Sequence, residues 1–269
     1  MTHRRSRLAD WYATNGRHEL AWRHTRDRWA VLVSEVMLQQ TQVARVADAW
    51  PRFVDRFPTA AAAAAAGPGA VIEAWGRLGY PRRARRLWEA TCIITTDGWP
   101  ADLAELPGVG RYTAAALSAL VDGVDAPAVE VNIRRVCERI AGRRLTTTQA
   151  EAASLRIGRP LHARERVLAL MDLGASVCRS RDPRCRACPL HRRCVARGVL
   201  ADETRHTQTR FEGSFRQRRG QVLARLRTAD TADVAELDPD ALASLVTDGL
   251  AAIDGSVARL PRLPRPQPL

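Results

Sequence analysis

The sequence predicts a mostly α-helical protein, and two observations carry this prediction. Alanine, leucine, arginine and valine dominate the chain, and apolar residues recur at helical spacing between glycine and proline breaks. Runs with the character of β-strands are few and short. The chain of 269 residues is long enough for one large or two modest domains with a true hydrophobic core.

Helices are expected at regular intervals along the first half of the chain. The first covers Arg7 to Asn15, and residues 29–50 form a long apolar helix or a helix pair. Thr59 is expected to cap a helix through the alanine run 60–66, which the sequence Gly67-Pro68-Gly69 ends. The remaining helices of this half are expected at residues 71–77, 82–96, 101–105, 113–121 and 132–140.

The second half of the chain is expected to contain a further helical part and a small separate module. Helices at about 149–156 and 166–174 precede a cluster of cysteines, and residues 201–214 are polar enough to form a linker. Residues 215–260 predict two helices, at 216–227 and 240–248, and a short hairpin at 251–260, which together suggest a winged-helix-like module. The proline-rich end, 261–269, is predicted to be disordered.

Charge and composition narrow the classes of function. The formal net charge is +13 and the isoelectric point is near 10.9, which indicates a polyanionic partner such as nucleic acid. All 42 basic residues are arginine, so no lysine side chain is available to form a Schiff base. GC-rich coding alone can cause arginine to replace lysine in this way. No stretch approaches a membrane span and the first residues lack an apolar signal core, so we expect a soluble, cytoplasmic protein.

Four cysteines with the spacing C-x6-C-x2-C-x5-C predict a metal centre. Six cysteines in all are too few for a disulfide-stapled scaffold, and the other two, Cys92 and Cys137, lie in apolar helical contexts typical of core residues. Zinc also binds four thiolates, but its usual pattern is two close pairs far apart, whereas one close pair flanked by single cysteines favours a [4Fe-4S] cluster. Zinc stays open as the alternative. The predicted ligands are Cys178, Cys185, Cys188 and Cys194.

The segment LPGVG at residues 106–110 predicts a tight hairpin between two helices. Gly108 and Gly110 permit backbone conformations that other residues avoid and allow a close approach to a ligand. The hairpin leads into a helix at Arg111, whose exposed N–H groups form an anion site suited to a phosphate oxygen. A plain turn between two helices is the alternative.

Glu35 is a candidate general acid. It lies inside an apolar helix, between VLVS and VML, where loss of solvent disfavours its charged form and raises its pKa. A hydrogen-bonded glutamate near the surface is the alternative, and the apolar flanks argue against it. At the spacing of an uninterrupted helix, Gln39 and Gln42 fall on the same face as Glu35.

These motifs together resemble a known family. The chain is similar to the helix-hairpin-helix DNA glycosylases that contain an iron–sulfur cluster, and most closely to the MutY adenine glycosylases. The resemblance covers about residues 7–200 and follows the same order throughout. The matching stretches are LAWRHTRDRWAVLVSEVMLQQTQVARV at 20–46, WGRLGY at 75–80, LPGVGRYTAAALSAL at 106–120, NIRRV at 132–136 and MDLGASVC at 171–178.

The resemblance implies roles for four residues around the reacting base. Glu35 matches the glutamate that protonates adenine at N7, and Gln40 matches the residue that wedges into the duplex where the base leaves. The family has a catalytic aspartate two residues before an asparagine that helps to hold the site. In this chain Glu130 stands at the aspartate's position and Asn132 matches the asparagine. The extra methylene of Glu130 keeps the charge but moves it by about 1.5 Å.

Tyr112 stands where bifunctional relatives such as endonuclease III have a catalytic lysine, so the resemblance implies a glycosylase without lysine-dependent lyase activity. A tyrosine at this place is also found in thymine-mismatch glycosylases. The loop that joins the first cysteines contains Arg179, Arg181 and Arg184, which we interpret as a phosphate clamp ordered by a structural cluster. A solvated charged loop is the alternative.

The resemblance also implies a two-lobed, all-α architecture with a DNA cleft between the lobes. One domain is expected at residues 20–127, with the hairpin, and the other joins residues 1–19 to the cluster-bearing residues 128–200. The implied function is hydrolytic removal of adenine mispaired with 8-oxoguanine or guanine in double-stranded DNA, by a monomer associated with the nucleoid. The residues after the linker are too few for the domain that reads 8-oxoguanine in longer members.

Three alternatives stay open at this point. The chain is also consistent with a thymine or uracil mismatch glycosylase on the same scaffold. It is consistent with a catalytically weak protein that binds lesions, if Glu130 disables the chemistry. A zinc-stabilised DNA-binding protein whose C-terminal module reads bases is the third.

Overall fold

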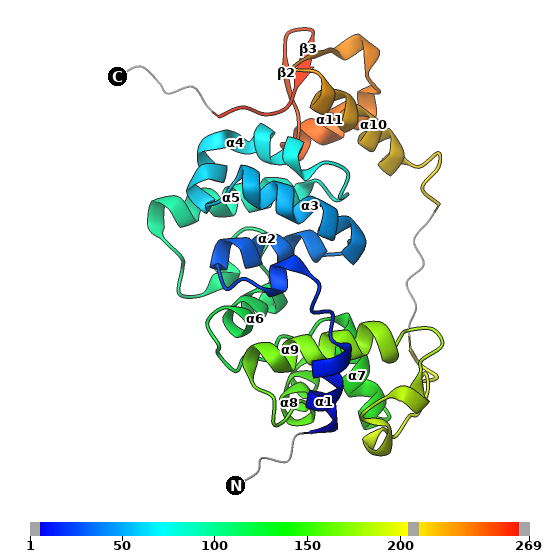
Figure 1. The fold of residues 1–269 in the computed structure, drawn as a ribbon. Helices are drawn as coiled ribbons and strands as arrows, with labels where there is room; N and C mark the ends of the chain where they lie inside the picture. Colours follow the sequence, from blue (N-terminus) through cyan, green and yellow to red (C-terminus); the bar gives the residue numbers. More distant parts are fainter. Residues whose placement is uncertain (1–5, 204–209, 264–269) are drawn as a thin grey trace. The chain divides into compact units, whose positions relative to one another are not determined.

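A computed structural model of the protein describes residues 6–203 and 210–263 and is predominantly helical (Figure 1). This confirms the predicted all-α class. The chain forms two compact units, each built from separated segments: residues 1–32 with 110–206, and residues 33–109 with 207–269. The borders between the units fall after Leu32, inside α2 (Arg28–Leu38), and after Val109, in the glycine hairpin. The predicted borders lie at residues 19 and 127. Within the described residues, no helix has the length and apolar character needed to cross a bilayer.

The first unit is a group of helices around an aliphatic core. It contains α1 (Arg7–Asn15), the start of α2 (Arg28–Leu38), α6 (Arg111–Leu120), α7 (Val131–Ala141), α8 (Thr147–Ile157) and α9 (Ala163–Asp172). Side-chain caps define where these helices begin: Ser6 accepts from the Ala9 amide, and Thr146 and Gln149 form a capping box on α8. A π-helical turn, Leu173–Val177, leads from α9 into the cysteine loop.

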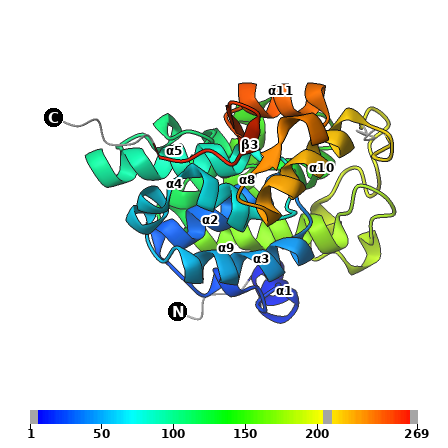
Figure 2. The ribbon, with the colours of Figure 1, turned by 90° about the horizontal axis from the view of Figure 1, so that it is seen from above.

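The second unit packs α3 (Val43–Arg56), α4 (Ala60–Trp75) and α5 (Arg82–Asp97) with the C-terminal module. Helices α4 and α5 lie side by side in both views (Figures 1 and 2). Aromatic rings fill the core between α3 and α4, where the Phe53 ring meets the Trp75 ring edge-on at 6.2 Å between centroids. The predicted helix at residues 29–50 is thus a pair, α2 and α3, with a break at residues 39–42.

Helix α4 consists of two helical stretches separated at the glycine-proline segment. The Thr59 hydroxyl caps the first stretch, and that stretch breaks at Gly67, both as predicted. Gly67 has a φ of 82°, which kinks the helix, and Pro68 begins a second helical stretch that runs to Trp75. Proline is well suited to the first position of a helix because its fixed φ is helical and its missing N–H would be unpaired there. The segment therefore ends the first stretch, and the second begins at Pro68, a few residues before its predicted start at residue 71.

The C-terminal module consists of α10 (Phe215–Thr228), α11 (Pro239–Thr247) and a small antiparallel sheet. Its strands β1 (Ala232–Asp233), β2 (Ala252–Asp254) and β3 (Val257–Arg259) are ordered β1-β3-β2. The predicted hairpin is β2–β3, whereas β1 is too short to have a sequence signal. Of the predicted linker and tail, residues 204–209 and 264–269 lie outside the described residues. The segment that follows β3 passes over α4, where the carbonyl oxygen of Pro261 lies close to Gly69.

Candidate active site

Glu35 lies on α2 among fully buried neighbours. Its exposed fraction is 4%, and Val33 and Val36 on either side are at most 1% exposed. The helix begins after Asp27, whose carboxylate accepts from the Ala30 amide, and apolar residues continue through Met37. The predicted burial of this carboxyl group is therefore present. Its predicted role as an acid stays a prediction at this stage.

Helix α2 ends at Leu38, and a strained turn follows. Gln40 has a φ of 55°, in the left-handed region that non-glycine residues rarely occupy, and its side chain is exposed. The Thr41 amide closes the turn by donating to the Leu38 carbonyl at 3.3 Å. The expectation that Gln39 and Gln42 continue the helical face of Glu35 is wrong, because the helix stops before both of them.

The hairpin at residues 106–110 adopts the predicted tight turn. Gly108 has a φ of 82°, and the Val109 amide donates to the Leu106 carbonyl at 3.0 Å. The side-chain amide of Gln39 donates to the Gly108 carbonyl at 3.2 Å, which ties the hairpin to the turn after α2. Gly110 is the N-cap of α6, and no side chain caps the helix there. A helix start of this kind is where an anion is favoured.

Arg111 begins α6, and its guanidinium is mostly exposed. It forms an ion pair with Glu151 at 2.8 Å while 73% of its side chain remains accessible. An exposed cation beside the uncapped start of a helix is a favourable arrangement for a phosphate group. The hairpin thus has the geometry that an anion site requires.

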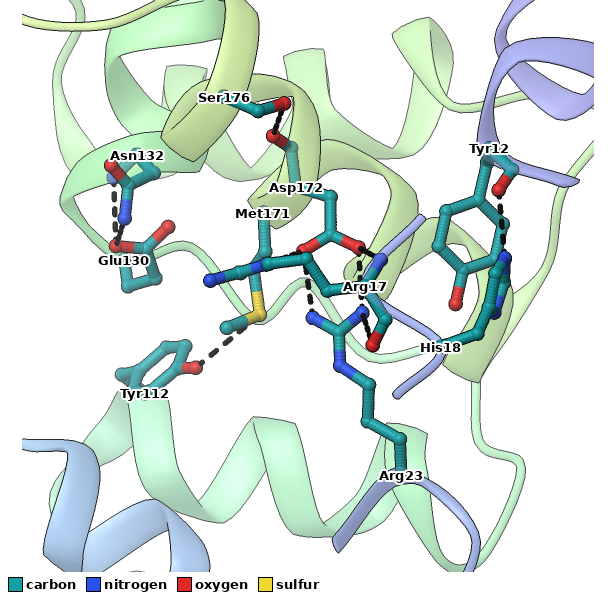
Figure 3. Close-up of polar contacts among 10 residues, drawn as sticks. All are labelled: Tyr12, Arg17, His18, Arg23, Tyr112, Glu130, Asn132, Met171, Asp172 and Ser176. Atoms are coloured by element: carbon teal, nitrogen blue, oxygen red, sulfur yellow. Dashed lines mark hydrogen bonds and ion pairs between the residues drawn. The ribbon is translucent and has the colours of Figure 1, made fainter. Parts of the chain in front are cut away.

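Glu130 is the N-cap of α7, and its carboxylate folds back on the start of that helix (Figure 3). One oxygen accepts from the backbone and side-chain amides of Asn132, at 2.7 and 2.9 Å, and the other accepts from the Ile133 amide at 2.9 Å. Burial raises the pKa of Glu130 above its ordinary value, although these hydrogen bonds oppose the shift. The carboxylate is thereby held in one place with its charge partly compensated.

Tyr112, on α6, contacts α9 through its hydroxyl group. The hydroxyl lies 3.8 Å from the sulfur of Met171, and the next residue, Asp172, has a carboxylate with no exposed surface (Figure 3). Arg17 and Arg23 surround that carboxylate, donating through nitrogen atoms at 2.5 to 2.9 Å. Although burial opposes ionisation, these arginines lower the pKa of Asp172.

The sequence-based assignment missed Asp172 and its two arginines. Asp172 lies in the apolar run VLALMDLGA, which is the same pattern of an acidic residue among apolar ones that singled out Glu35. That pattern identifies a buried carboxyl group but not its partners, since Arg17 and Arg23 are about 150 residues away in the sequence. Arg135 was missed for the same reason: it donates to the Cys178 carbonyl at 2.7 Å and to the Asn132 side chain at 2.6 Å.

The predicted clamp arginines do not all lie together. Arg179 and Arg181 line a cavity of about 510 Å³ together with Asn132 and Arg135, so these two arginines face the start of α7. Arg179 is partly engaged, because it also donates to the carboxylate of Asp182 at 2.7 Å. Arg184 lines a different hollow, beside Cys185.

The four clustered cysteines line one small enclosed cavity of about 20 Å³, together with Arg139 and Val177. All four are free thiols. Among the described residues, no three metal-binding side chains converge in the way that a single metal ion requires. Four thiols around one cavity are a ligand set that a [4Fe-4S] cluster uses, and zinc can also bind four thiolates.

Hydrogen-bond donors also point at these sulfur atoms. Arg139 lies 3.5 Å from the Cys178 sulfur and the Arg197 amide 3.4 Å from the Cys194 sulfur. Donors of this kind stabilise thiolate ligands and tune iron–sulfur centres. Burial raises the pKa of the Cys188 thiol to about 11, so a bound metal is needed to keep it as a thiolate near neutral pH. The donor set therefore fits a [4Fe-4S] cluster.

Comparison with known proteins identifies the family. Residues 33–160 match the family model described as HhH-GPD superfamily base excision DNA repair protein. An adenine DNA glycosylase from Mycolicibacterium smegmatis is 40% identical over 267 residues, which cover 90% of each chain. The chain belongs to the adenine DNA glycosylase family. Another relative with that name, from Mycobacterium tuberculosis, is 39% identical and covers 93% of this chain and 91% of its own.

A solved structure supports the same scaffold for this adenine DNA glycosylase family member. A thermostable thymine-DNA glycosylase is 26% identical, with a TM-score of 0.65, over 71% of this chain and 93% of its own. The resemblance drawn from the sequence motifs is thus confirmed. Glu35 belongs to the second unit and Glu130, Asn132 and Tyr112 to the first, so the predicted meeting of the two glutamates stays a prediction.

Proposed function

We propose that the protein removes adenine mispaired with 8-oxoguanine or guanine from double-stranded DNA, by hydrolysis of the N-glycosidic bond. The observation that carries this proposal is the buried carboxyl group of Glu35, on a helix that leads directly into the exposed left-handed turn at Gln40. Membership of the adenine DNA glycosylase family supports adenine as the base. The products are free adenine and an abasic site.

Glu35 acts as the general acid. In this proposal the carboxyl group of Glu35, which is 4% exposed on α2, carries the proton that is donated. Transfer of that proton to N7 of adenine makes the base a better leaving group. The bond between the base and C1′ of the deoxyribose then breaks, with its electron pair leaving on the adenine.

Glu130 stabilises the positive charge that develops on the sugar. Its three amide donors hold the carboxylate in one orientation, so no reorganisation is needed when the charge appears. Water then adds to C1′ and releases a proton to solvent, and Glu35 regains a proton from solvent, which completes the hydrolysis. Two carboxyl groups with different protonation states are what this oxocarbenium chemistry requires.

Access to the base requires that its nucleotide leave the helical stack. We propose that Gln40 occupies the vacated space, because it is exposed at the tip of a turn and its backbone is fixed. In the first unit, the start of α6 with Arg111 and the hollow lined by Arg179 and Arg181 are proposed to bind phosphates of the DNA backbone. Arg184 contributes to the same positive field from the neighbouring hollow.

A [4Fe-4S] cluster bound by Cys178, Cys185, Cys188 and Cys194 is proposed to order the clamp loop. The cluster supplies a covalent crosslink between four points of the loop and takes no part in the hydrolysis. Because the chain lacks lysine and has Tyr112 at the lyase position, the enzyme is proposed to be monofunctional. We also propose that it acts as a monomer in the cytoplasm.

The test is single-turnover base release from four duplexes, containing A:8-oxoG, A:G, T:G and U:G, followed by alkali to reveal abasic sites. Release of adenine from the first two, lost in Glu35→Gln, is the expected result. Release of thymine or uracil alone would contradict the proposal. Strand cleavage without alkali, or a borohydride-trapped adduct, would contradict the monofunctional assignment.

A further inference from the structure

Arg83 is a buried arginine whose guanidinium binds the end of the helix that carries Glu35. Its side chain lies on α5 and donates to the carbonyl oxygens of Val36 at 2.8 Å, Met37 at 2.9 Å and Gln39 at 2.5 Å. Val36 and Met37 belong to the last turn of α2, where carbonyl groups lack partners within the helix. A cation at this end is also favourable to the helix dipole.

The same guanidinium binds the two segments that flank the turn. It donates to the Thr41 hydroxyl at 2.8 Å and to the Gly79 carbonyl at 3.0 Å. The rings of Trp75 and Tyr80 lie against it, with centroids 5.2 and 5.5 Å from its central carbon. One side chain thus contacts the end of α2, the turn after it and the segment before α5.

Arg83 has no carboxylate partner among the described residues. It is 9% exposed, and burial lowers its pKa to about 10, so it stays protonated at neutral pH. A buried cation is stable only where dipoles compensate it, and here backbone carbonyls do so. This arrangement makes the positions of those carbonyls depend on the guanidinium.

The two segments that Arg83 joins are both strained. Gln40 has a φ of 55° and Tyr80 a φ of 46°, and each of these residues follows a carbonyl that accepts from Arg83. Left-handed conformations of non-glycine residues persist only where surrounding contacts over-determine them. Arg83 supplies those contacts on both sides at once.

We infer that Arg83 is a positioning residue for base extrusion: it locks the turn that presents Gln40 at the end of the Glu35 helix. This inference rests on the proposed function, because it assigns the turn a task in moving adenine out of the duplex. Lysine cannot replace it, since a compact ammonium has three donors and lacks the planar fork that reaches six acceptors, the Tyr80 carbonyl included.

Arg85 provides a matched control on the same helix. It donates to the Gly249 carbonyl at 2.8 Å and to Glu89 at 2.8 Å, so it binds the C-terminal module and makes no contact with the turn. Thr41→Val provides a milder second variant, because it removes one acceptor of Arg83 and leaves the arginine in place.

The experiment compares Arg83→Lys, Arg85→Lys and Thr41→Val with the wild type on two substrates, after confirming folding by the melting temperature. One substrate is the A:8-oxoG duplex, and the other has adenine opposite an abasic site, where extrusion requires less energy. For Arg83→Lys we expect at least a tenfold loss of the single-turnover rate on the paired duplex and no more than about a twofold loss on the unpaired one. Thr41→Val should show a smaller loss of rate that is again larger on the paired duplex than on the unpaired one. Arg85→Lys should have the rates of the wild type on both substrates.

A second readout separates this inference from the proposed chemistry. In the Glu35→Gln background, fluorescence of 2-aminopurine placed beside the target adenine reports extrusion without base release. Arg83→Lys should lower the fluorescence gain at saturating protein, even if the wild type proves to release no adenine. Equal losses on the two substrates, or an unchanged fluorescence gain, would overturn the inference.

Discussion

A single oxygen of the Glu130 carboxylate accepts hydrogen bonds from both amide groups of Asn132, from the backbone N–H at 2.7 Å and from the side-chain N–H at 2.9 Å. This contact explains how a glutamate occupies a position where the family has aspartate. The longer side chain folds back over the start of α7, so the extra methylene is absorbed by the cap. The charge is retained at the helix N-terminus, where the dipole favours it.

Replacing Glu130 with glutamine should separate catalysis from capping. Glutamine keeps one acceptor oxygen but places an NH2 donor opposite the other helix amide, so the free energy of unfolding should fall by about 1 to 3 kcal/mol. Loss of the negative charge should slow adenine release on the order of 100-fold, measured in single turnovers. Asp238→Asn, which alters the matching cap of α11, should leave the rate unchanged. Equal rates for the wild type and Glu130→Gln would remove Glu130 from the mechanism.

The rate of adenine release should fall at acidic pH because of Glu130. Burial raises the pKa of this group above 4.5, and only its ionised form stabilises the sugar cation. As the pH falls through that raised pKa, the group gains a proton and the logarithm of the rate should decline with a slope near one. A pH profile of single-turnover rates checks this. Glu130→Gln should lack that acidic limb, and a limb that persists in the variant would assign it to another group.

Asp172→Asn should strongly destabilise the first unit. Removing the charge leaves Arg17 and Arg23 without their buried partner, which costs about 3 to 5 kcal/mol. Because its arginines lower the pKa of Asp172 below 3.8, the ionised carboxylate stabilises the fold above that value. The difference between wild type and variant should therefore shrink as the pH falls through the lowered pKa. Urea unfolding at several pH values measures it.

An exposed ion pair, Asp182 with Arg179, serves as the control for the stability loss expected in Asp172→Asn. Asp182 binds Arg179 with 91% of its side chain exposed, so Asp182→Asn should change the unfolding free energy by less than about 1 kcal/mol. If both variants lost equal stability, burial would not be the reason for the effect.

Loss of one proposed iron ligand should remove the metal centre. Cys188→Ser should lower the iron and sulfide content of anaerobically purified protein and abolish its visible absorption, whereas Cys92→Ser, outside the cavity, should retain both. One zinc per chain and no visible absorption in the wild type would favour the zinc alternative. DNA binding by Cys188→Ser should weaken because the loop that carries Arg179 and Arg181 loses its anchor.

The helices could be predicted from the sequence because their periodicity and caps are local. Thr59 and Ser6 mark helix starts, and the hairpin glycines mark a turn, with no need for distant contacts. The sequence left open whether residues 29–50 form one helix or a pair, because the polar residues 39–42 contain no glycine or proline to mark a stop. The contacts of Arg83 with the end of α2 show where the break lies. The break of α4 at Gly67 was predictable from local residues, and only the earlier start of the second stretch, at Pro68, differed.

The site was predictable to the extent that its residues lie within motifs. Glu35 and the cysteines have local signatures, and Glu130 follows from its spacing to Asn132. The arginines that hold these groups have no such signature in a chain with 42 of them. Arg23, Arg83 and Arg135 differ from the solvated ones only in their burial and partners, which are properties of the folded chain.

The close approach at Gly69 has a consequence for how such chains vary. A β-carbon at this position would lie 2.4 Å from the carbonyl oxygen of Pro261, so any side chain must displace the segment that follows β3. The requirement for glycine in α4 is therefore imposed by a part of the chain about 190 residues later. A variant of this chain without the segment after β3 should therefore tolerate a larger residue at position 69, so the glycine and that segment depend on each other.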